Sequence, residues 1–401
     1  MVMLPAHVER ERLLRTLALA AFIIFFQAYM VAPIIPVLSA GFGTAIQTVG
    51  LIVPAYLIPY GVATLIFGLL ADRIGVHRLM LASLAVFVVL TALTATAQSI
   101  AQLGLWRVLT GMGVCGVVPL ALVLIGSLFP YEERGRPLGW LFGAMAGGMA
   151  FGSTFGAVLE PLVGWRGLFL LVALGGASVL VLLWPHRTLI ASAKRPVPGT
   201  LGNLLQGYCS LLSTPRGRRT YGYVVVNSVF HSGVFTWLGV YFAQRYGLGP
   251  VGIGVALLGY GIPGFLFGPL IGRAADRWGR ARLLPVGLAL GTLGAAILML
   301  HGPLILAVVA VTVLSLGYDM TQPLFAGIIT TLGGPRSGQA MGLNVFALFT
   351  GFGVGSLLFG MALELGFAVA LGLFVTVQAL ASALAVRWFH SEVPIAPVCS
   401  C

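Results

Sequence analysis

Two stretches of this chain, GLLADRIGVHRLM at residues 68–80 and GRAADRWGRARLL at residues 272–284, carry Gly, Asp-Arg and Gly at matching positions. Their aspartates, Asp72 and Asp276, lie 204 residues apart in a chain of 401 residues. A second pair of short segments, RGRPLG at 134–139 and SGQAMG at 337–342, repeats with an offset of 203. Two unrelated patterns with nearly the same offset predict a duplicated unit.

Composition indicates that lipid is the solvent of this chain. Hydrophobic residues make up 59% of the sequence and charged residues only 8%, and the mean hydropathy is +1.03. A soluble domain has about a quarter of its residues charged. Every backbone group must find an internal partner in lipid, which restricts membrane spans to helices and closed barrels. The apolar runs here are long and do not alternate, so they predict helices.

The apolar runs predict an all-α membrane protein with twelve transmembrane helices in two pseudo-symmetric six-helix bundles. The expected spans lie near residues 15–38, 48–71, 78–98, 101–128, 138–160, 167–186, 220–243, 250–272, 282–300, 303–331, 338–363 and 366–389. The longest polar stretch divides them six and six, which gives the expected domains 1–186, a cytoplasmic linker 187–219, and 220–401. Within the linker, LGNLLQGYCSLL has the pattern of a short interfacial helix.

The basic residues predict the orientation in the membrane. Of the 22 Lys and Arg residues, 19 fall in loops on one side, Arg166 and Arg245 fall on the other, and Arg107 lies within a span. Cytoplasmic loops carry the excess of Lys and Arg. We therefore expect an inner or plasma membrane protein with both termini in the cytoplasm. The net charge of +12 is scattered over separate short loops, so we expect no nucleic-acid partner.

The first 13-residue stretch resembles the signature loop between helices 2 and 3 of the major facilitator superfamily, and the second resembles its copy in the other half. Helix 4 reads RVLTGMGV at 107–114, and GWRGLF at 164–169 is similar to the family's entry into helix 6. The similarity extends from about residue 17 to 390. The residues at the marked positions of the paired loops are Gly68, Asp72, Arg73, Gly75, Arg78, Gly272, Asp276, Arg277, Gly279 and Arg280.

The resemblance implies a role for the paired loops and a monomeric transporter with alternating access. In the family these loops are similar to a latch that holds the cytoplasmic side closed, and a membrane anchor with a tight turn is the alternative interpretation. In the branch of drug:proton antiporters, helix 5 carries a glycine motif. Here the spacing of Gly148, Gly152 and Gly156 predicts close packing against a neighbouring helix.

Polar residues deep within spans are the candidate site. Of ten acids, only Asp319 lies well inside a span, and His231 is the only deep histidine, with Asn227 one turn before it. The resemblance implies that helices 1, 4, 7 and 10 line a central cavity. The predicted substrate- and proton-binding residues are Gln27, Arg107, Asn227, His231, Asp319 and Gln322. Tyr29, Trp237, Tyr260 and Tyr318 form either an aromatic wall or ordinary packing.

Two of the buried charges allow more than one interpretation. Arg107 has no acid within the first six spans, so backbone carbonyls, a water-filled cavity or an anionic substrate must meet its charge. Asp319 is either a proton carrier or a structural residue paired with helix-end amides or Tyr318. Both interpretations of each residue stay open at the level of sequence.

These features together predict a secondary active transporter of a small organic solute. Proton-coupled export by antiport is the leading hypothesis, and proton-coupled uptake or uniport is the alternative. An intramembrane enzyme or receptor on a transporter scaffold is a third class. The chain has no phosphate-binding Gly-Lys-Ser/Thr loop, no HExxH motif and no cysteine cluster, so we expect no enzyme activity, no cofactor and no metal.

Overall fold

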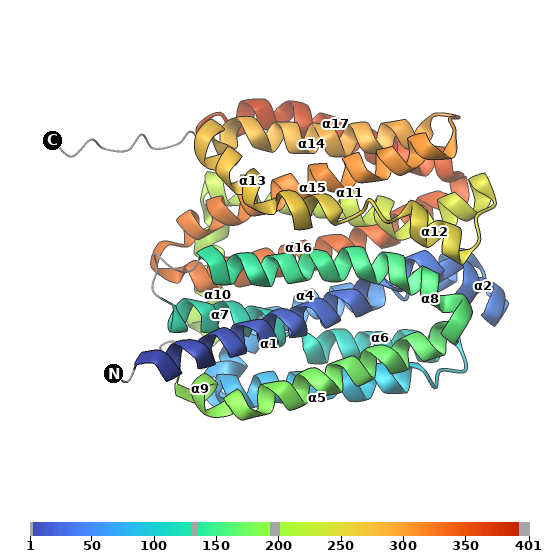
Figure 1. Ribbon diagram of the computed structural model, residues 1–401. Coiled ribbons are helices and arrows are strands. Elements are labelled where there is room, and N and C mark those ends of the chain that lie inside the picture. The colour runs from blue at the N-terminus through green and yellow to red at the C-terminus, as the bar shows by residue number, and fades with distance from the viewer. Residues whose placement is uncertain (1–2, 130–134, 193–200, 393–401) are drawn as a thin grey trace.

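The computed structural model describes residues 3–129, 135–192 and 201–392, which form helices joined by short turns (Figure 1). The helices up to the middle of the chain are α1 (Met3–Tyr29), η1 (Ala32–Ile34), α2 (Ile35–Phe42), α3 (Ile46–Gly50), α4 (Pro54–Ile74), α5 (Val76–Thr94), α6 (Ile100–Val114), α7 (Val117–Leu128), α8 (Gly135–Leu183), η3 (Trp184–His186) and α9 (Arg187–Ser192). The later helices are α10 (Leu201–Ser213), α11 (Pro215–Tyr246), α12 (Pro250–Ala256), α13 (Ile262–Trp278), α14 (Arg280–Met299), α15 (Leu304–Gly333), η4 (Gly334–Arg336), α16 (Ser337–Ala362), η5 (Leu363–Leu365) and α17 (Phe367–Trp388).

The described helices confirm the predicted all-α membrane fold and agree with twelve crossings. Within residues 3–129, 135–192 and 201–392, ten helical segments are long and apolar enough to span a membrane. One of them, residues 136–191, runs through a break at Gly164, where φ is 68°, and therefore supplies two crossings. The region of α12 and α13 supplies the remaining crossing in two shorter pieces. The linker segment predicted as an interfacial helix is also helical, as α10.

Four spans that we predicted as continuous are broken in the structure. The span 48–71 is interrupted by the turn between α3 and α4. The span 15–38 is interrupted after Tyr29 by the 3-10 turn η1, next to Pro33 and Pro36, which cannot donate backbone hydrogen bonds. The span 101–128 is interrupted between α6 and α7. The span 250–272 is interrupted before Gly261, whose φ of 78° lies in the region that favours glycine. Hydropathy averaged over a span does not register such local breaks.

Left-handed glycines repeat at equivalent joints of the two halves. Three pairs have offsets of 204, 204 and 202 residues: Gly43 and Gly247 (φ 60° and 64°), Gly75 and Gly279 (97° and 80°), and Gly164 and Gly366 (68° and 99°). The first pair ends α2 and α11, the second joins α4 to α5 and α13 to α14, and the third precedes the last helix of each half. The same turns at the same spacing are the structural counterpart of the sequence repeat. The domain boundaries at 186 and 220 stay a prediction.

The helices differ strongly in how far they are covered by other helices. In the most apolar window of α11, 83% of the residues are buried, whereas in that of α17 only 22% are buried. Helices α1 to α9 occupy the lower part of Figure 1 and α11 to α17 the upper part. Between these groups α4 packs along α16, and α12 and α13 pack along α8. Thus α11 is a central helix, and α17 exposes most of its surface to the surroundings.

Glycines in α8 allow close contact with α1, as the sequence predicted. A Cβ added at Gly148, Gly152 or Gly156 would lie 2.5–2.7 Å from a backbone oxygen of α1 or of the residue directly after it. Only glycine fits this approach, because real Cβ atoms do not come so near to backbone atoms. This contact fixes α1 against α8.

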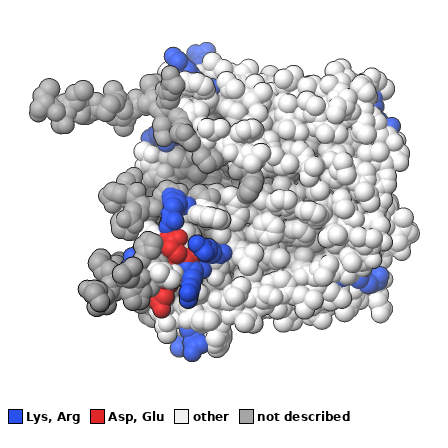
Figure 2. All heavy atoms as spheres, in the orientation of Figure 1, with Lys and Arg blue, Asp and Glu red and all other residues white. Residues whose placement is uncertain are grey.

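Charged side chains are concentrated at one end of the molecule. Figure 1 shows that α1 begins, and α17 ends, at the same end of the helix bundle. Figure 2 shows most of the visible Lys and Arg at that end and a broad uncharged band across the rest of this face. The uncharged band is the surface expected to contact hydrocarbon.

Candidate functional site

Asp319 lies on α15 beside the break between α12 and α13. Its Oδ2 accepts a hydrogen bond from Ser315 Oγ at 3.0 Å, and its carboxylate accepts another from the backbone N–H of Gly264. Ser315 Oγ in turn accepts from the backbone N–H of Gly261 at 2.7 Å. Gly264 is in the first turn of α13, where unpaired backbone N–H groups favour a negative charge. The carboxylate therefore caps the start of α13.

Space around Asp319 requires glycine at position 264. A Cβ added there would lie 2.6 Å from the Asp319 carboxyl carbon and from Oδ1. Within the described residues, the ion pairs join Glu11 to Arg136 and Glu392 to Arg216 and Arg219. Asp319 thus has only neutral donors around it in that part of the chain.

His231 lies on α11 and packs face to face against an aromatic ring of α15. The centroids of His231 and Tyr318 are 3.6 Å apart, and the rings are inclined by 17°. His231 Nε2 contacts the hydroxyl of Tyr260, and the tautomer decides which of the two donates. His231 is 1% exposed, and its Nδ1 has no hydrogen-bond partner among the described residues. The imidazole is therefore held by two tyrosines and keeps one free nitrogen.

A central aromatic cluster surrounds His231 and reaches across to α1. We define it as Tyr29, Phe235, Tyr260, Tyr318 and Phe352. Ring centroids are 5.1 Å apart for Tyr29 and Phe235, 4.1 Å for Phe235 and Tyr260, and 5.9 Å for Tyr318 and Phe352. Four different long helices thus meet in one packed aromatic region. Trp237, the other predicted wall residue, instead donates to the carbonyl of Ser356 at 3.1 Å.

Arg107 is fully buried on α6 and is held by carbonyl oxygens and one ring. Its Nε donates to the Ile52 carbonyl at 3.3 Å, and its Nη1 donates to Gln27 Oε1 at 3.0 Å. The guanidinium carbon lies 4.2 Å from the centre of the Tyr56 ring. Its Nη2 has no partner among the described residues. Carbonyl groups thus account for most of its hydrogen bonds, and one donor is left for another acceptor.

Four of the six predicted substrate- and proton-binding residues fall into two groups. Gln27 and Arg107 form the first group, and His231 with Asp319 and their tyrosine neighbours form the second. Aromatic side chains connect the groups: Tyr56 neighbours Tyr60 at 6.1 Å, and Tyr60 stacks on Phe349 at 4.1 Å. The structure shows no direct hydrogen bond between the two groups within the described residues. Their connection is through packing.

Asn227 belongs to a third set of contacts, which joins α11, α15 and α17. Its Nδ2 donates to Thr321 Oγ1 at 2.8 Å, and its Oδ1 accepts from Gln378 Nε2 at 2.9 Å. Both Asn227 and Gln378 are buried. Gln322, the remaining predicted residue, has a buried Nε2 without a partner in the described chain. The amide cluster of Asn227 ties three helices together beside the site.

The predicted latch loops are described only in part. The side-chain surroundings of Gly68, Asp72, Gly272, Asp276 and Arg277 lie outside the described residues. Gly75 and Gly279 precede α5 and α14 in equivalent conformations, with ψ angles of 139° and 153°. Arg73 and Arg78 are exposed. Arg280 reaches α15, because a Cβ added at Gly327 would lie 2.9 Å from its Nε.

Sequence reasoning missed three residues that hold the candidate site together. Ser315 and Gly264 contact Asp319, and Gln378 contacts Asn227. Gln378 was visible as a polar residue within an apolar run, which is a signal that sequence reasoning can use. Ser315 precedes Asp319 by one helical turn, which places both on one face. Gly264 gave no signal, because its contact depends on how α13 packs against α15.

A sequence profile of the Major Facilitator Superfamily matches residues 17–355 and, in a second match, residues 220–398. The chain is 23% identical over 332 residues to an uncharacterized MFS-type transporter, YwfA, of Bacillus subtilis, covering 82% of this chain and 80% of that protein. It is 27% identical over 180 residues to Multidrug resistance protein 3 of Bacillus subtilis, covering 44% of this chain and 35% of the relative.

Two solved structures are similar to this fold along nearly their full length. The human organic anion transporter MFSD10 (TETRAN) has a TM-score of 0.75 at 18% identity, covering 94% of this chain and 99% of that chain. A bacterial homolog of the human lysosomal transporter Spinster, in an inward-facing and unoccupied conformation, has a TM-score of 0.76 at 17% identity, covering 96% and 98%. At these identities the likeness shows the shared fold.

Proposed function

This chain belongs to the major facilitator superfamily and is a transporter, and from this premise we propose that it exports a small organic solute in exchange for protons. The relative named Multidrug resistance protein 3 favours export. The central aromatic cluster favours a solute that is partly apolar, because aromatic faces bind apolar surface and tyrosine hydroxyls orient polar groups. Two six-helix bundles, joined by the linker 187–219, would alternate in access to this region.

One observation carries the proposal of proton coupling: a deep carboxylate that is bound only by a hydroxyl and a backbone N–H among the described residues. Asp319 accepts from Ser315 and Gly264 and has no basic partner there. In a low-dielectric region an unpaired charge is costly, so a proton is a natural partner for such a group. We infer that Asp319 binds the coupling proton.

Proton binding at Asp319 would act on α13. The charged carboxylate is a strong acceptor for the Gly264 N–H, and protonation removes the charge that favours this cap. The other end of α13 contains Asp276 and joins α14 through Gly279. The protonation state of Asp319 would thus bias the position of α13 relative to α15, and with it the second latch loop. His231, held by Tyr260 and Tyr318, is placed to contact the solute or to share the proton.

The orientation is also a proposal: the end that carries the termini and most basic residues faces the cytoplasm of an inner or plasma membrane. Cys209 on α10 is exposed, whereas Cys115 is buried. Cys209 should therefore react with a membrane-impermeant thiol reagent in inside-out vesicles. Labelling of Cys209 in intact cells would contradict this orientation.

Flux in proteoliposomes tests the function. Purified protein is reconstituted, an inward- or outward-directed pH gradient is imposed, and uptake of a panel of organic dyes, organic anions and sugars is followed. Accumulation of a solute against its gradient, with proton movement in the opposite direction, supports antiport. Proton movement in the same direction indicates symport, and flux that is indifferent to the pH gradient indicates uniport.

A further inference from the structure

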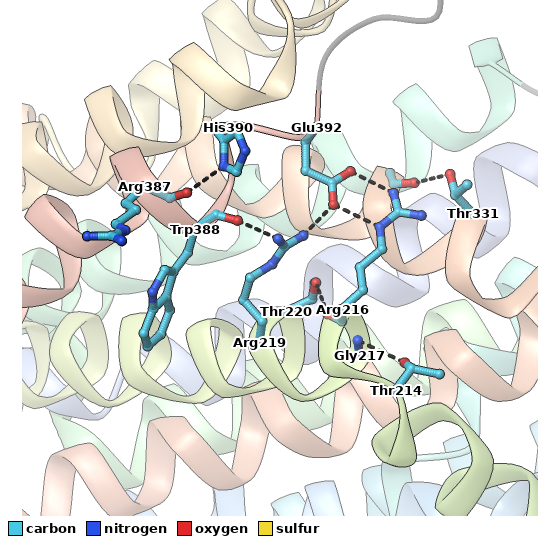
Figure 3. Close-up of polar contacts among 11 residues, drawn as sticks. Thr214, Arg216, Gly217, Arg219, Thr220, Thr331, Arg387, Trp388, His390 and Glu392 are labelled. Atoms are coloured by element: carbon cyan, nitrogen blue, oxygen red, sulfur yellow. Dashed lines mark hydrogen bonds and ion pairs between the residues drawn. The ribbon is translucent and has the colours of Figure 1, made fainter.

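A basic hollow lies where α11 begins and α17 ends (Figure 3). Its charged and aromatic lining is formed by Arg216, Arg218, Arg219, Arg387, Trp388 and His390. It is distant in the fold from the central aromatic cluster, because it gathers the terminal turns of two helices. Nothing in the proposed transport mechanism uses these side chains.

One acid organises this hollow. The carboxylate of Glu392 accepts from Arg216 Nε at 2.8 Å and from Arg216 Nη2 at 2.6 Å, and it also accepts from Arg219. Arg219 donates to the Trp388 carbonyl and lies 4.4 Å from the centre of the Phe389 ring. Figure 3 shows both guanidinium groups directed at Glu392. The two arginines are therefore fixed in place by a single counter-charge.

Positive charge in the hollow exceeds what Glu392 can neutralise. Four arginines against one glutamate leave an excess of three positive charges, with His390 counted as neutral. Arg218 and Arg387 are exposed, and no side-chain hydrogen bond or ion pair of theirs is seen within the described residues. Arg219 Nε is buried without a partner in the same part of the chain. The hollow thus presents two exposed guanidinium groups that have no acceptor among the described residues.

The surface next to the hollow is of the kind that contacts lipid chains. Along α17 the large apolar residues are exposed by 56% at Val377, 61% at Leu380, 45% at Leu384 and 62% at Val386. This apolar face ends at Trp388, which is 47% exposed. Tryptophan is enriched at the boundary between hydrocarbon and head groups. We therefore expect the hollow to lie at the depth of lipid head groups, beside acyl chains.

We propose that this hollow binds the phosphate of an anionic phospholipid, whose acyl chains lie along the exposed apolar face of α17. The guanidinium group of arginine can donate two parallel hydrogen bonds to the oxygens of a phosphate. Basic pockets at the ends of transmembrane helices bind anionic lipid head groups. Arg218 and Arg387 supply positive charges that Glu392 does not neutralise. Arg216 and Arg219 supply N–H donors whose positions are fixed by Glu392. A soluble phosphate would meet the same arginines but would gain nothing from the apolar face.

Lipid-dependent thermal stability tests this site. The wild-type protein in a neutral detergent is titrated with phosphatidylglycerol, with phosphatidylcholine, or with inorganic phosphate, and the apparent melting temperature is followed. A ligand that binds the folded protein raises its melting temperature, and the rise grows with the logarithm of ligand concentration above the dissociation constant. We expect a concentration-dependent rise of several degrees with phosphatidylglycerol only. The double variant R218Q/R387Q, which leaves the Glu392 contacts intact, should need at least about tenfold more of this lipid.

The control variant R187Q/R336Q removes two exposed arginines from other turns and should titrate like the wild type. Unchanged titration of R218Q/R387Q would overturn the site, as would equal stabilisation by phosphatidylcholine. Equal stabilisation by inorganic phosphate would overturn the assignment to lipid. If R218Q/R387Q has a lower melting temperature without added lipid, native mass spectrometry of bound phosphatidylglycerol gives the same comparison independently of stability.

Discussion

The hydroxyl of Ser315 donates a hydrogen bond to the carboxylate of Asp319, with 3.0 Å between the two oxygen atoms, and the same hydroxyl accepts from the backbone N–H of Gly261 at 2.7 Å. A single side chain thus connects Asp319 to the break between α12 and α13. Because Gly264 also donates to Asp319, the residue before α13 and the first turn of α13 are both tied to this pair. A change of charge at Asp319 would first alter the hydrogen bonds at this break.

Asp319→Asn should abolish transport driven by a pH gradient while counterflow exchange of the solute survives. The amide keeps an oxygen that can accept from Ser315 and Gly264, but it does not bind and release a proton. Flux in proteoliposomes with and without a pH gradient measures this difference. Glu160→Gln is the matched control, because Glu160 is a partly exposed acid within α8. Lower expression and melting temperature with unchanged pH-driven flux per folded molecule would make Asp319 a structural cap only.

His231→Gln should alter the pH dependence of transport, because imidazole is the side chain whose ordinary pKa lies nearest to neutral pH. Tyr260→Phe removes the hydroxyl that contacts His231 Nε2 without removing the imidazole. Transport rates measured across a pH series should therefore change in shape for His231→Gln and only in amplitude for Tyr260→Phe. If both variants weaken solute binding equally and keep the wild-type pH profile, His231 is a binding residue.

Arg107→Gln should destabilise the protein by about 2–4 kcal/mol, through the loss of buried hydrogen bonds and of a desolvated cation–π contact. The variant leaves the Ile52 and Gln27 acceptors without their donor. Arg166→Gln is a suitable comparison, since Arg166 also lies 4.2 Å from a ring centre, that of Trp165, but is exposed. Apparent melting temperatures in detergent measure the effect. Lost transport at an unchanged melting temperature would instead place Arg107 in a solute-binding role.

Gly75→Ala and Gly279→Ala should each cost about 1–3 kcal/mol, because their backbone conformations are almost restricted to glycine. Their φ angles are 97° and 80°. Gly104→Ala is the control for these glycine variants, because a Cβ there meets nothing within 4 Å.

If the two loops form a latch, Asp72→Asn and Asp276→Asn should slow transport without reducing the amount of folded protein. Wild-type rates in both aspartate variants would leave the loops as membrane anchors.

Glu392→Gln should remove an acid-sensitive part of the stability. Burial raises the pKa of Glu392, but the hydrogen bonds and charges of Arg216 and Arg219 outweigh it and hold the pKa below its ordinary value of 4.5. A folded-state pKa below the unfolded value contributes stability above that value, and this stability is lost as pH falls through the folded pKa. Melting temperatures measured from neutral pH downward should therefore drop more for the wild type than for Glu392→Gln. Parallel curves would contradict this role, and Glu11→Gln serves as the control.

The sequence determined the class of fold because its main signals are one-dimensional. Low charge and long apolar runs require helices in lipid, whatever their packing. The repeat of Asp72 at Asp276, and the glycines beside them, required a duplicated unit, and the left-handed turns at Gly75 and Gly279 are its physical basis. The depth of a residue in the membrane also follows from the number of residues between it and the start of its span. This count places Asp319 and His231 well inside their spans.

Tertiary structure alone decided what these deep residues touch. The contact between Gly264 and Asp319 depends on the approach of α13 to α15, and the stacking of His231 on Tyr318 depends on the rotation of α11. Such contacts join positions far apart in the chain, and their geometry follows from packing that no local pattern encodes. The same reason explains Glu392, a residue near the chain end whose two arginine partners at the start of α11 became visible only when the helix ends met.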